Sequence, residues 1–247
     1  MSDMSQDFEI AKQLAAAYEA PPEAIELINE TDVLLVVGVT ASGKNTIIEH
    51  LLETDHYSYI VSHTTRDPRT NHGELEKNGQ DYFFVDEAEM GRLIKDHAFI
   101  EAKLVHDRDI YGTSIEQIQK AHDLGRVAVT DIDVQGVAEY KQLSDKVKAV
   151  FIVPPSFEEW SKRILKRPGE HGTDATDLQK RLSAAVDEFE HALETDYFEF
   201  VINDDIEEAV HRVEAIVRGD TDADHAKAGR KLAEDILVEL KYALQNA

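Results

Sequence analysis

VLLVVGVTASGKNT, residues 33–46, carries the clearest indication of the fold in this sequence. Its first five residues form a continuous β-prone apolar run, which is typical of a strand buried within a parallel sheet. The spacing Gly-x4-Gly-Lys follows directly, and a helix is expected from Asn45 to Leu52. A strand, a glycine-rich turn and a helix in this order predict a phosphate-binding loop, because backbone N–H groups at a helix N-terminus can surround phosphate oxygens.

This loop predicts a set of residues that contact a nucleoside triphosphate. Lys44 would place a positive charge on the β and γ phosphates. Asn45 stands where Ser or Thr is usual, and its amide oxygen could face magnesium or the water around that ion. The predicted contact set is Gly38, Thr40, Ala41, Ser42, Gly43, Lys44, Asn45 and Thr46. GTPases, ATPases and kinases all use such a loop, so the reaction must be inferred from the rest of the chain.

The composition of the chain narrows its partners and its location. With 247 residues, one principal domain is expected. The net charge of −24 argues against a nucleic-acid backbone as partner, since that binding depends on Lys and Arg. No apolar run approaches the roughly 18 residues that a membrane helix needs, and the N-terminus MSDMSQDFEI lacks the features of a secretory signal. We therefore expect a cytoplasmic protein without a membrane span.

Strand patterns and helical patterns alternate along the rest of the chain. Further strands are predicted at 57–61, 127–132, 147–153 and 198–202, and helices near 114–124, 156–166 and 177–195. This alternation predicts an α/β fold of the P-loop NTPase type, a three-layer sandwich with a parallel central sheet.

Other segments depart from this alternation. Between Ser62 and Gly112, polar turns and short β-prone runs predict an inserted subdomain with a mixed sheet. Pro, Gly and small polar residues from Arg167 to Thr176 predict a mobile loop between two helices. Ahead of the first strand, two short helices are predicted at Asp7–Ala20 and Pro22–Asn29.

The last part of the sequence predicts an amphipathic helix, because Leu232, Ile236, Leu240 and Ala243 recur at helical spacing. Its apolar face would pack on the body of the protein or form a contact between two copies. The sequence leaves the oligomeric state, monomer or homodimer, open.

Six short motifs follow the phosphate loop along the chain. They are TTRDPR at 64–69, NGQDYFF at 78–84, FIE at 99–101, YGT at 111–113, DIDVQG at 131–136 and NDD at 203–205. They occur in the order seen in guanylate kinases, and the chain resembles that family from about Val33 to Val217. The resemblance implies an ATP- and Mg²⁺-dependent nucleoside monophosphate kinase that phosphorylates GMP to GDP.

The resemblance also implies a division of the chain. A guanylate-kinase-like domain would span 31–218, with its core at 31–61 and 113–218, a GMP-binding insert at 62–112 and a helical lid at about 163–181. An N-terminal helical extension at 1–30 and the C-terminal helix at 219–247 lie outside it.

The residues that would bind GMP are implied in the same way. The family positions that hold its phosphate are matched by Arg66, Arg69, Tyr82 and Tyr111. Those that face its base are matched by Ser62, Glu101 and Thr113, and a position near the GMP by Asp133. The chemistry agrees, because planar guanidinium groups suit phosphate and the carboxylate of Glu101 offers two acceptors to the N1–H and 2-amino groups of guanine. Adenine would leave that carboxylate without those donors. Acceptance of dGMP is left open.

The remaining matches concern the transfer step. Asp131 ends a predicted strand and would order hydrated magnesium. Arginines beside the predicted mobile loop resemble the lid residues that clamp the transferring phosphoryl group, and Asn203 and Asp204 resemble the strip beside the adenine of ATP. The catalytic set is then Lys44, Arg66, Arg163, Arg167, Arg181 and Asp131, acting by in-line transfer. Each lid arginine could instead pair with a nearby glutamate, and Asn203 and Asp204 could form an Asx turn.

The chain departs from the family pattern in two places. Its phosphate loop differs at Val39, Thr40, Ala41 and Asn45, and Ala41 replaces a glycine, which matters if the backbone needs a positive φ there. The segment from Gly73 to Gly79 carries a short excess. A catalytically weak or inactive guanylate-kinase-like module that binds a protein is therefore kept as the alternative, and a sugar-phosphate kinase as a second one.

Overall fold

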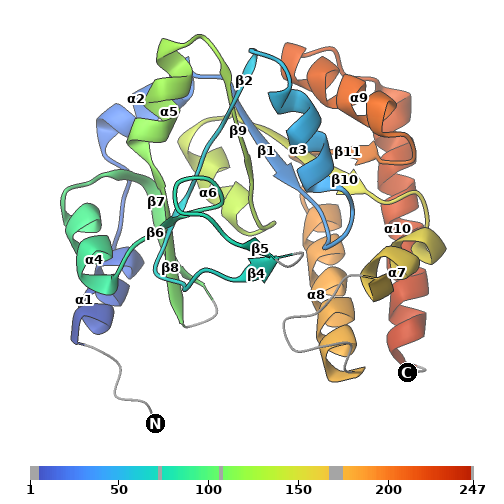
Figure 1. Cartoon of the computed structure of the whole chain (residues 1–247). Helices are drawn as coiled ribbons and strands as arrows, with labels where there is room; N and C mark the ends of the chain where they lie inside the picture. The colour runs from blue at the N-terminus through green and yellow to red at the C-terminus, as the bar shows by residue number, and fades with distance from the viewer. Residues whose placement is uncertain (1–5, 72–73, 106–107, 167–174, 246–247) are drawn as a thin grey trace. The chain divides into compact units, whose positions relative to one another are not determined.

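The computed structural model describes residues 6–71, 74–105, 108–166 and 175–245 (Figure 1). The chain divides into two compact units. The first unit comprises Met1–Thr31 and Ser58–Ala128, and the second unit comprises Asp32–Tyr57 and Val129–Ala247. The fold is α/β, with a parallel sheet, a smaller mixed sheet and helices around them, as the sequence predicted.

The parallel sheet has the strand order β11-β10-β1-β9-β2. Its strands are β1 (Val33–Val37), β2 (Tyr57–Tyr59), β9 (Val127–Asp131), β10 (Lys148–Val153) and β11 (Phe198–Ile202). Strand β10 pairs in parallel with β1 on one side and with β11 on the other. Every residue of β1 is buried, which explains why that strand is apolar throughout rather than alternating.

The helices of the second unit are α3 (Lys44–Leu52), α6 (Gly136–Leu143), α7 (Phe157–Lys166), α8 (Ala175–Glu194), α9 (Ile206–Arg218) and α10 (Ala223–Gln245). Local capping sets the bounds of α9: the Asp205 side chain accepts the N–H of Glu208 at 3.0 Å, and Gly219 ends the helix at φ 84°. Residues 167–174, most of the predicted mobile loop, lie outside the described residues.

Helix α10 is the amphipathic helix predicted for the end of the chain. It lies beside α8 and packs on β11 (Figure 1). Ile236 and Leu240 are buried in that contact, and a Cβ on Gly229 would stand 2.7 Å from the carbonyl oxygen of Phe200. The apolar face of α10 therefore packs on the body of the protein, one of the two roles that the sequence predicted.

The mixed sheet of the first unit has the strand order β6-β3-β8-β7, and β4 and β5 form a separate hairpin. The strands are β3 (His63–Thr64), β4 (Thr70–Asn71), β5 (Glu74–Leu75), β6 (Phe83–Phe84), β7 (Phe99–Val105) and β8 (Asp109–Ser114). Strand β3 pairs in parallel with β6 and antiparallel with β8. The mixed sheet predicted between residues 62 and 112 is thus present.

The helices described beside this sheet are α1 (Gln6–Ala16), α2 (Pro22–Glu30), α4 (Glu87–Lys95) and α5 (Ile115–Asp123). Helix α1 packs against α4 and β7, with Phe8, Ala11 and Ala15 in the same core cluster as Met90 and Phe99. None of the helices in the described ranges is long and apolar enough to cross a membrane.

Candidate active site

The loop between β1 and α3 has the backbone of an anion cradle. Three of its residues have positive φ angles: 142° at Gly38, 65° at Ala41 and 101° at Gly43. Successive N–H groups turned inward by such angles form a concave anion-binding surface. A Cβ on Gly38 would stand 2.6 Å from the carbonyl oxygen of Ile152, so this position accepts only glycine. Ala41 stands where the family pattern has a glycine, and its backbone does adopt a positive φ, in the left-handed region.

Two side chains in the loop fit a phosphate group. The ammonium group of Lys44 folds over the loop and donates to the carbonyls of Gly38 and, at 3.3 Å, Val39. The Ser42 hydroxyl is buried and has no hydrogen-bond partner among the described residues. A phosphate in the cradle would give the hydroxyl a partner, because buried polar groups are normally hydrogen-bonded.

Residues from distant parts of the second unit brace this loop. Trp160, fully buried on α7, donates its indole N–H to the carbonyl of Thr40 at 2.8 Å. The buried side-chain amide of Asn203 donates to the carbonyl of Ser42, also at 2.8 Å. Asn203 was predicted to lie beside adenine, and its contact in this structure is with the phosphate loop. Asp204 is exposed, and its side chain accepts the N–H of Asp205 at 2.9 Å.

The predicted magnesium donors are oxygen groups around the loop. Asn45 and Thr46 are exposed in the first turn of α3, and half-buried Asp131 ends β9. Oxygen ligands suit Mg²⁺, and the ion usually completes its octahedron with phosphates and water. No group of three or more His, Asp or Glu side chains in the described part of the chain could hold a metal ion. These residues therefore fit an ion held largely by nucleotide and water, rather than by a protein cage.

Asp133 and Glu188 add negative charge near the phosphate loop. Asp133 accepts the N–H groups of Gln135 and Gly136 at 2.9 and 2.8 Å, at the N-terminus of α6. Burial raises the pKa of Glu188 on α8 to about 7, Lys44 opposes the rise, and Asp133 and Asp187 add to it. Sequence reasoning missed Glu188. Its spacing from buried Ala185 and Ala192 on α8 places it on the inward side of the helix, and that signal could have revealed it.

The predicted lid arginines lie in different surroundings. Arg163 on α7 pairs with Glu159 one turn earlier at 3.3 Å, the pairing considered as the alternative. Arg181 is half-buried on α8. Arg167 lies outside the described residues.

In the first unit, three predicted base-facing residues form one hydrogen-bonded chain. Glu101 and Thr113 are opposite each other on β7 and β8, and the Thr113 hydroxyl donates to Glu101 Oε1 at 2.8 Å. The hydroxyls of Thr113 and Ser62 lie 3.4 Å apart. Glu101 is only 9% exposed, so its carboxylate is fixed on a strand and largely withdrawn from water.

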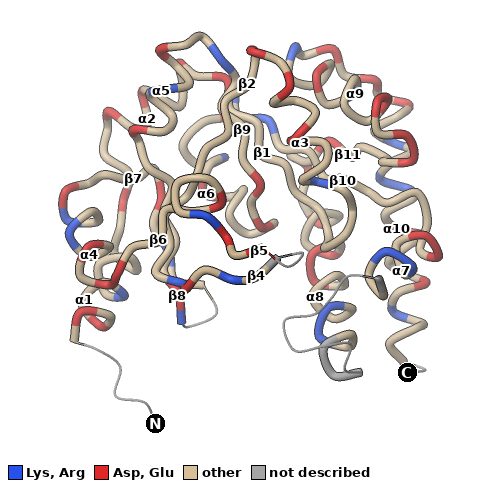
Figure 2. Tube along the Cα trace, in the orientation of Figure 1, with Lys and Arg blue, Asp and Glu red and all other residues tan. Residues whose placement is uncertain are grey.

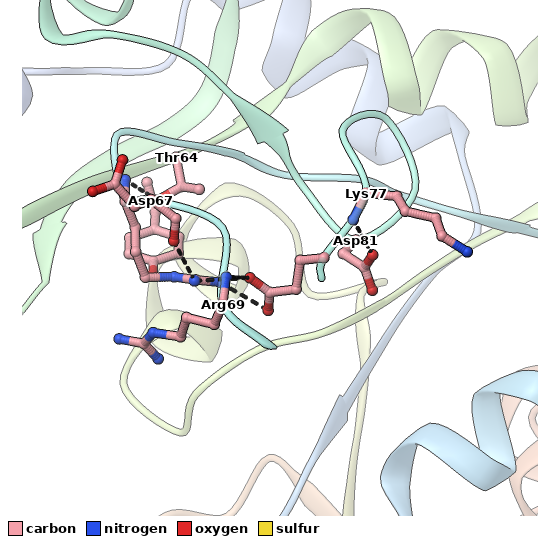
Figure 3. Close-up of polar contacts among 8 residues, drawn as sticks. Thr64, Asp67, Arg69, Lys77 and Asp81 are labelled. Atoms are coloured by element: carbon pink, nitrogen blue, oxygen red, sulfur yellow. Dashed lines mark hydrogen bonds and ion pairs between the residues drawn. The ribbon is translucent and has the colours of Figure 1, made fainter. Parts of the chain in front are cut away.

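The predicted phosphate ligands meet at a second point of this unit. Arg66 donates from Nε to the Tyr111 hydroxyl at 3.0 Å, and its guanidinium lies 5.1 Å from the centre of the Tyr82 ring. The turn that carries Arg66 is fixed by Thr64, whose hydroxyl accepts the Arg66 N–H (Figure 3). Arg69 is exposed on the same turn. Arg66, Tyr82 and Tyr111 therefore lie together, and their role as phosphate ligands stays a prediction.

A residue that sequence reasoning missed completes this corner. Glu76 accepts from Arg66 Nη1 at 2.8 Å and Nη2 at 3.1 Å, and from the Arg69 backbone N–H at 2.8 Å. Burial raises the pKa of Glu76, but the hydrogen bonds from Arg66 and Arg69 outweigh it, so the pKa is lowered. Glu76 lies in the excess segment between Gly73 and Gly79, the signal that could have directed attention to it.

Acidic side chains dominate the chain outside these clusters. Asp and Glu number 50 against 26 Lys and Arg, and they occur along the described helices of both units (Figure 2). The basic residues lie scattered among them, so positive charge for a phosphate has to come from the individual groups described above.

Comparison with known proteins identifies the family of this chain. A model of the Guanylate kinase family matches residues 30–220. A guanylate kinase of Campylobacter jejuni (strain RM1221) is 38% identical over 189 residues, 75% of this chain and 87% of that protein. One of Schizosaccharomyces pombe is 35% identical over 190 residues, 76% of this chain and 90% of that protein. The crystal structure of guanylate kinase from Anaplasma phagocytophilum matches with a TM-score of 0.56 and 30% identity, covering 79% of this chain and 89% of that one. This chain belongs to the guanylate kinase family of nucleoside monophosphate kinases.

Proposed function

We propose that the protein transfers the γ-phosphoryl group of ATP to GMP, giving ADP and GDP. The observation that carries the choice of GMP is the buried carboxylate of Glu101, held by Thr113 on the sheet that also presents Tyr111 and Arg66. Guanine has two adjacent donors, N1–H and the 2-amino group, that satisfy a carboxylate. Adenine offers an acceptor at N1, so the same carboxylate would lose hydrogen bonds and adenine would be rejected.

The phosphate of GMP would bind at the corner of Arg66, Arg69, Tyr82 and Tyr111. Arginine and tyrosine donors near one another support this assignment, because charge-assisted hydrogen bonds hold phosphate more strongly than neutral ones. Ser62 and Thr113 would contact the base beside Glu101, with Asp133 near the nucleoside. In this proposal residues 62–112 form the GMP-binding insert of a domain at 31–218.

The ATP phosphates would bind in the loop from Gly38 to Thr46. Lys44 would contact the β and γ phosphates, and Asn45 and Asp131 would face Mg²⁺, the latter through water. Mg²⁺, when bound with ATP, neutralises charge on the phosphates. Arg163, Arg167 and Arg181, in a lid at about 163–181, would stabilise the transferring group during an in-line step. No general base is required, because the phosphate of GMP is already anionic.

The test is ADP release by the purified protein with Mg-ATP and GMP, AMP, UMP or no acceptor. We expect ADP only with GMP, loss of at least about a hundredfold in Lys44→Ala, and a selective loss with GMP in Glu101→Gln. Glu74→Gln, on an exposed residue of the same subdomain, is the matched control and should behave as wild type. GMP binding without ADP formation would instead support the protein-binding module. If a sugar phosphate is added as a further acceptor, ADP formation with it would support a sugar-phosphate kinase. The matched relatives, which are named guanylate kinases, do not favour the module.

A further inference from the structure

The N-terminal extension is part of the core of the first unit, although the family match begins only at residue 30. Three residues of α1, Phe8, Ala11 and Ala15, are buried against α4 and the sheet. Helix α4 allows the close approach through Gly91, where a Cβ would lie 3.7 Å from that of Ala11. Helix α1 of the extension therefore packs against the side of this unit that bears β7.

One side chain of the extension makes polar contacts with β7. The Tyr18 hydroxyl donates to the carbonyl oxygen of Phe99 at 2.5 Å and accepts the N–H of the same residue at 3.2 Å. Both backbone groups of Phe99 are thus bonded to one hydroxyl. Few side chains can do this, because the group must be donor and acceptor at once.

These contacts fall where β7 is irregular. Phe99 pairs with Ser114 and Glu101 pairs with Thr113, so Ile100 is an extra residue in the ladder. A bulge of this kind bends the strand, changes the direction of the next side chain and leaves ladder groups to be satisfied elsewhere. The next side chain is Glu101, the proposed reader of guanine.

Packing of the Phe99 ring fixes the same point from the other side. Its atoms lie so close to Gly112 on β8 that a Cβ there would approach within 2.9 Å. The ring also meets His63 edge-on, with centroids 5.3 Å apart. Backbone and ring of Phe99 are therefore both held, and Glu101 follows two residues later. Burial raises the pKa of Tyr18, and the negative charge of Glu101 raises it further, which is consistent with the two groups being neighbours.

We propose that the extension supports the guanine-reading strand, and that Tyr18 is a positioning residue for Glu101. The hydroxyl of Tyr18 fixes the bulge at Phe99 and Ile100 and thereby the direction in which the Glu101 carboxylate points. This inference rests on the proposed function, because it assigns Tyr18 a part in recognising the base of GMP. Tyr18 does not touch the substrate.

The variant Tyr18→Phe removes only the hydroxyl and keeps the ring. Deleting the extension would be a poor test, since it would expose the core that Phe8, Ala11 and Ala15 cover. The measurements are KM for GMP, KM for ATP, kcat, and the preference for GMP over IMP, which lacks the 2-amino group. Tyr242→Phe, on an exposed tyrosine of α10, is the control.

We expect Tyr18→Phe to raise KM for GMP about threefold to tenfold and to narrow the GMP-to-IMP preference, with KM for ATP within about twofold of wild type. A tyrosine that only stabilised the fold would lower the melting temperature and leave the base preference unchanged. An unchanged preference therefore overturns the inference while the proposed function stands.

Hydrogen exchange of the β7 amides in the same variant tests whether Tyr18 fixes the strand, independently of base recognition. Faster exchange over residues 99–103 is expected, and exchange equal to wild type would overturn the support role without any assay of activity. If wild-type protein does not phosphorylate GMP, the proposed function is wrong and so is the role in base recognition. Exchange then still decides whether Tyr18 fixes the strand.

Discussion

Glu76 holds one edge of the Arg66 guanidinium through two hydrogen bonds, and both side chains are more than nine-tenths buried. Arg66 Nη1 also donates to the Asp67 carbonyl, so the outer edge of the group is bound to the protein. The other edge, formed by Nε and Nη2, faces the Tyr111 hydroxyl. A phosphate oxygen would therefore meet Arg66 at the Tyr111 edge. Glu76 fixes the plane in which that edge is presented.

Glu76→Gln should weaken GMP binding without affecting ATP. The amide cannot accept from both guanidinium nitrogens, so the plane of Arg66 is no longer fixed. We expect KM for GMP to rise about tenfold, equivalent to about 1.4 kcal/mol, and KM for ATP to remain within about twofold. Steady-state kinetics with each substrate varied in turn provides the measurement.

The exposed neighbour Glu74 gives the matched control, Glu74→Gln, which should leave both constants unchanged. A fall in KM for GMP in Glu76→Gln would contradict the positioning role. It would mean that the carboxylate competes with the phosphate of GMP for Arg66. Glu76→Ala is less informative, because removing one member of a buried ion pair costs about 3–5 kcal/mol of stability.

Ala41→Gly should stabilise the protein. Ala41 has φ 65°, a left-handed conformation that costs a residue with a Cβ about 1 kcal/mol. Glycine loses part of that gain through its greater freedom in the unfolded chain, so a net gain of up to about 1 kcal/mol is expected in urea unfolding. Ala228→Gly, on the exposed side of α10, should lose about 1 kcal/mol. Equal losses in the two variants would show that the conformation at Ala41 is unstrained.

Glu188 should make the stability of the protein fall as pH rises. Burial raises the pKa of this carboxyl from 4.5 to about 7. The unfolded chain therefore loses the proton first as pH rises from about 4.5 to 7, and stability falls across that window, by up to about 3 kcal/mol. Glu188→Gln should remove this fall, so its advantage in stability over wild type should grow from pH 5 to pH 8.

Urea unfolding at pH 5, 6, 7 and 8 measures this effect. The control Glu194→Gln changes an exposed residue of the same helix and should follow the wild-type curve. A difference in unfolding free energy between Glu188→Gln and wild type that stays constant with pH would contradict this prediction. It would show that the carboxyl does not titrate in that window.

Local sequence was sufficient for the phosphate loop and for most strands of the parallel sheet, but the helices α4, α6 and α9 were not predicted. The strand predicted at 33–37 is β1 with the same bounds, since five consecutive β-prone apolar residues have one stable environment, a sheet covered on both faces. The β-prone residues Tyr82–Val85 form only the short strand β6, Phe83–Phe84, because its partner β3 spans only His63–Thr64. Such ends depend on the neighbouring strand, which local propensity does not contain.

The polar pairs of the site could not be predicted in this way. Tyr18 and Phe99 are 81 residues apart, and Asn203 and Ser42 are 161 apart, so no local pattern relates them. Arg66 and Glu76 are only ten residues apart, but their pairing requires the hairpin of β4 and β5 to bring them together. The ordered motifs identified most proposed ligands, and they carried no information on the residues that orient those ligands.

Asn203 can be tested for two roles that predict different nucleotide preferences. If it braces the phosphate loop through the Ser42 carbonyl, Asn203→Ala should raise KM for ATP and for GTP as phosphate donors by the same factor, about threefold to tenfold. If it contacts adenine, KM for ATP should rise and KM for GTP should not. Exposed Glu207, in the first turn of α9, gives the control Glu207→Ala. We expect the equal rise in the two KM values, because the Asn203 amide donates to the Ser42 carbonyl at 2.8 Å. A Cβ on Gly43 would stand 2.1 Å from the Asn203 side-chain nitrogen, so the loop packs directly on that side chain. A selective rise for ATP would show that Asn203 leaves the loop when nucleotide binds.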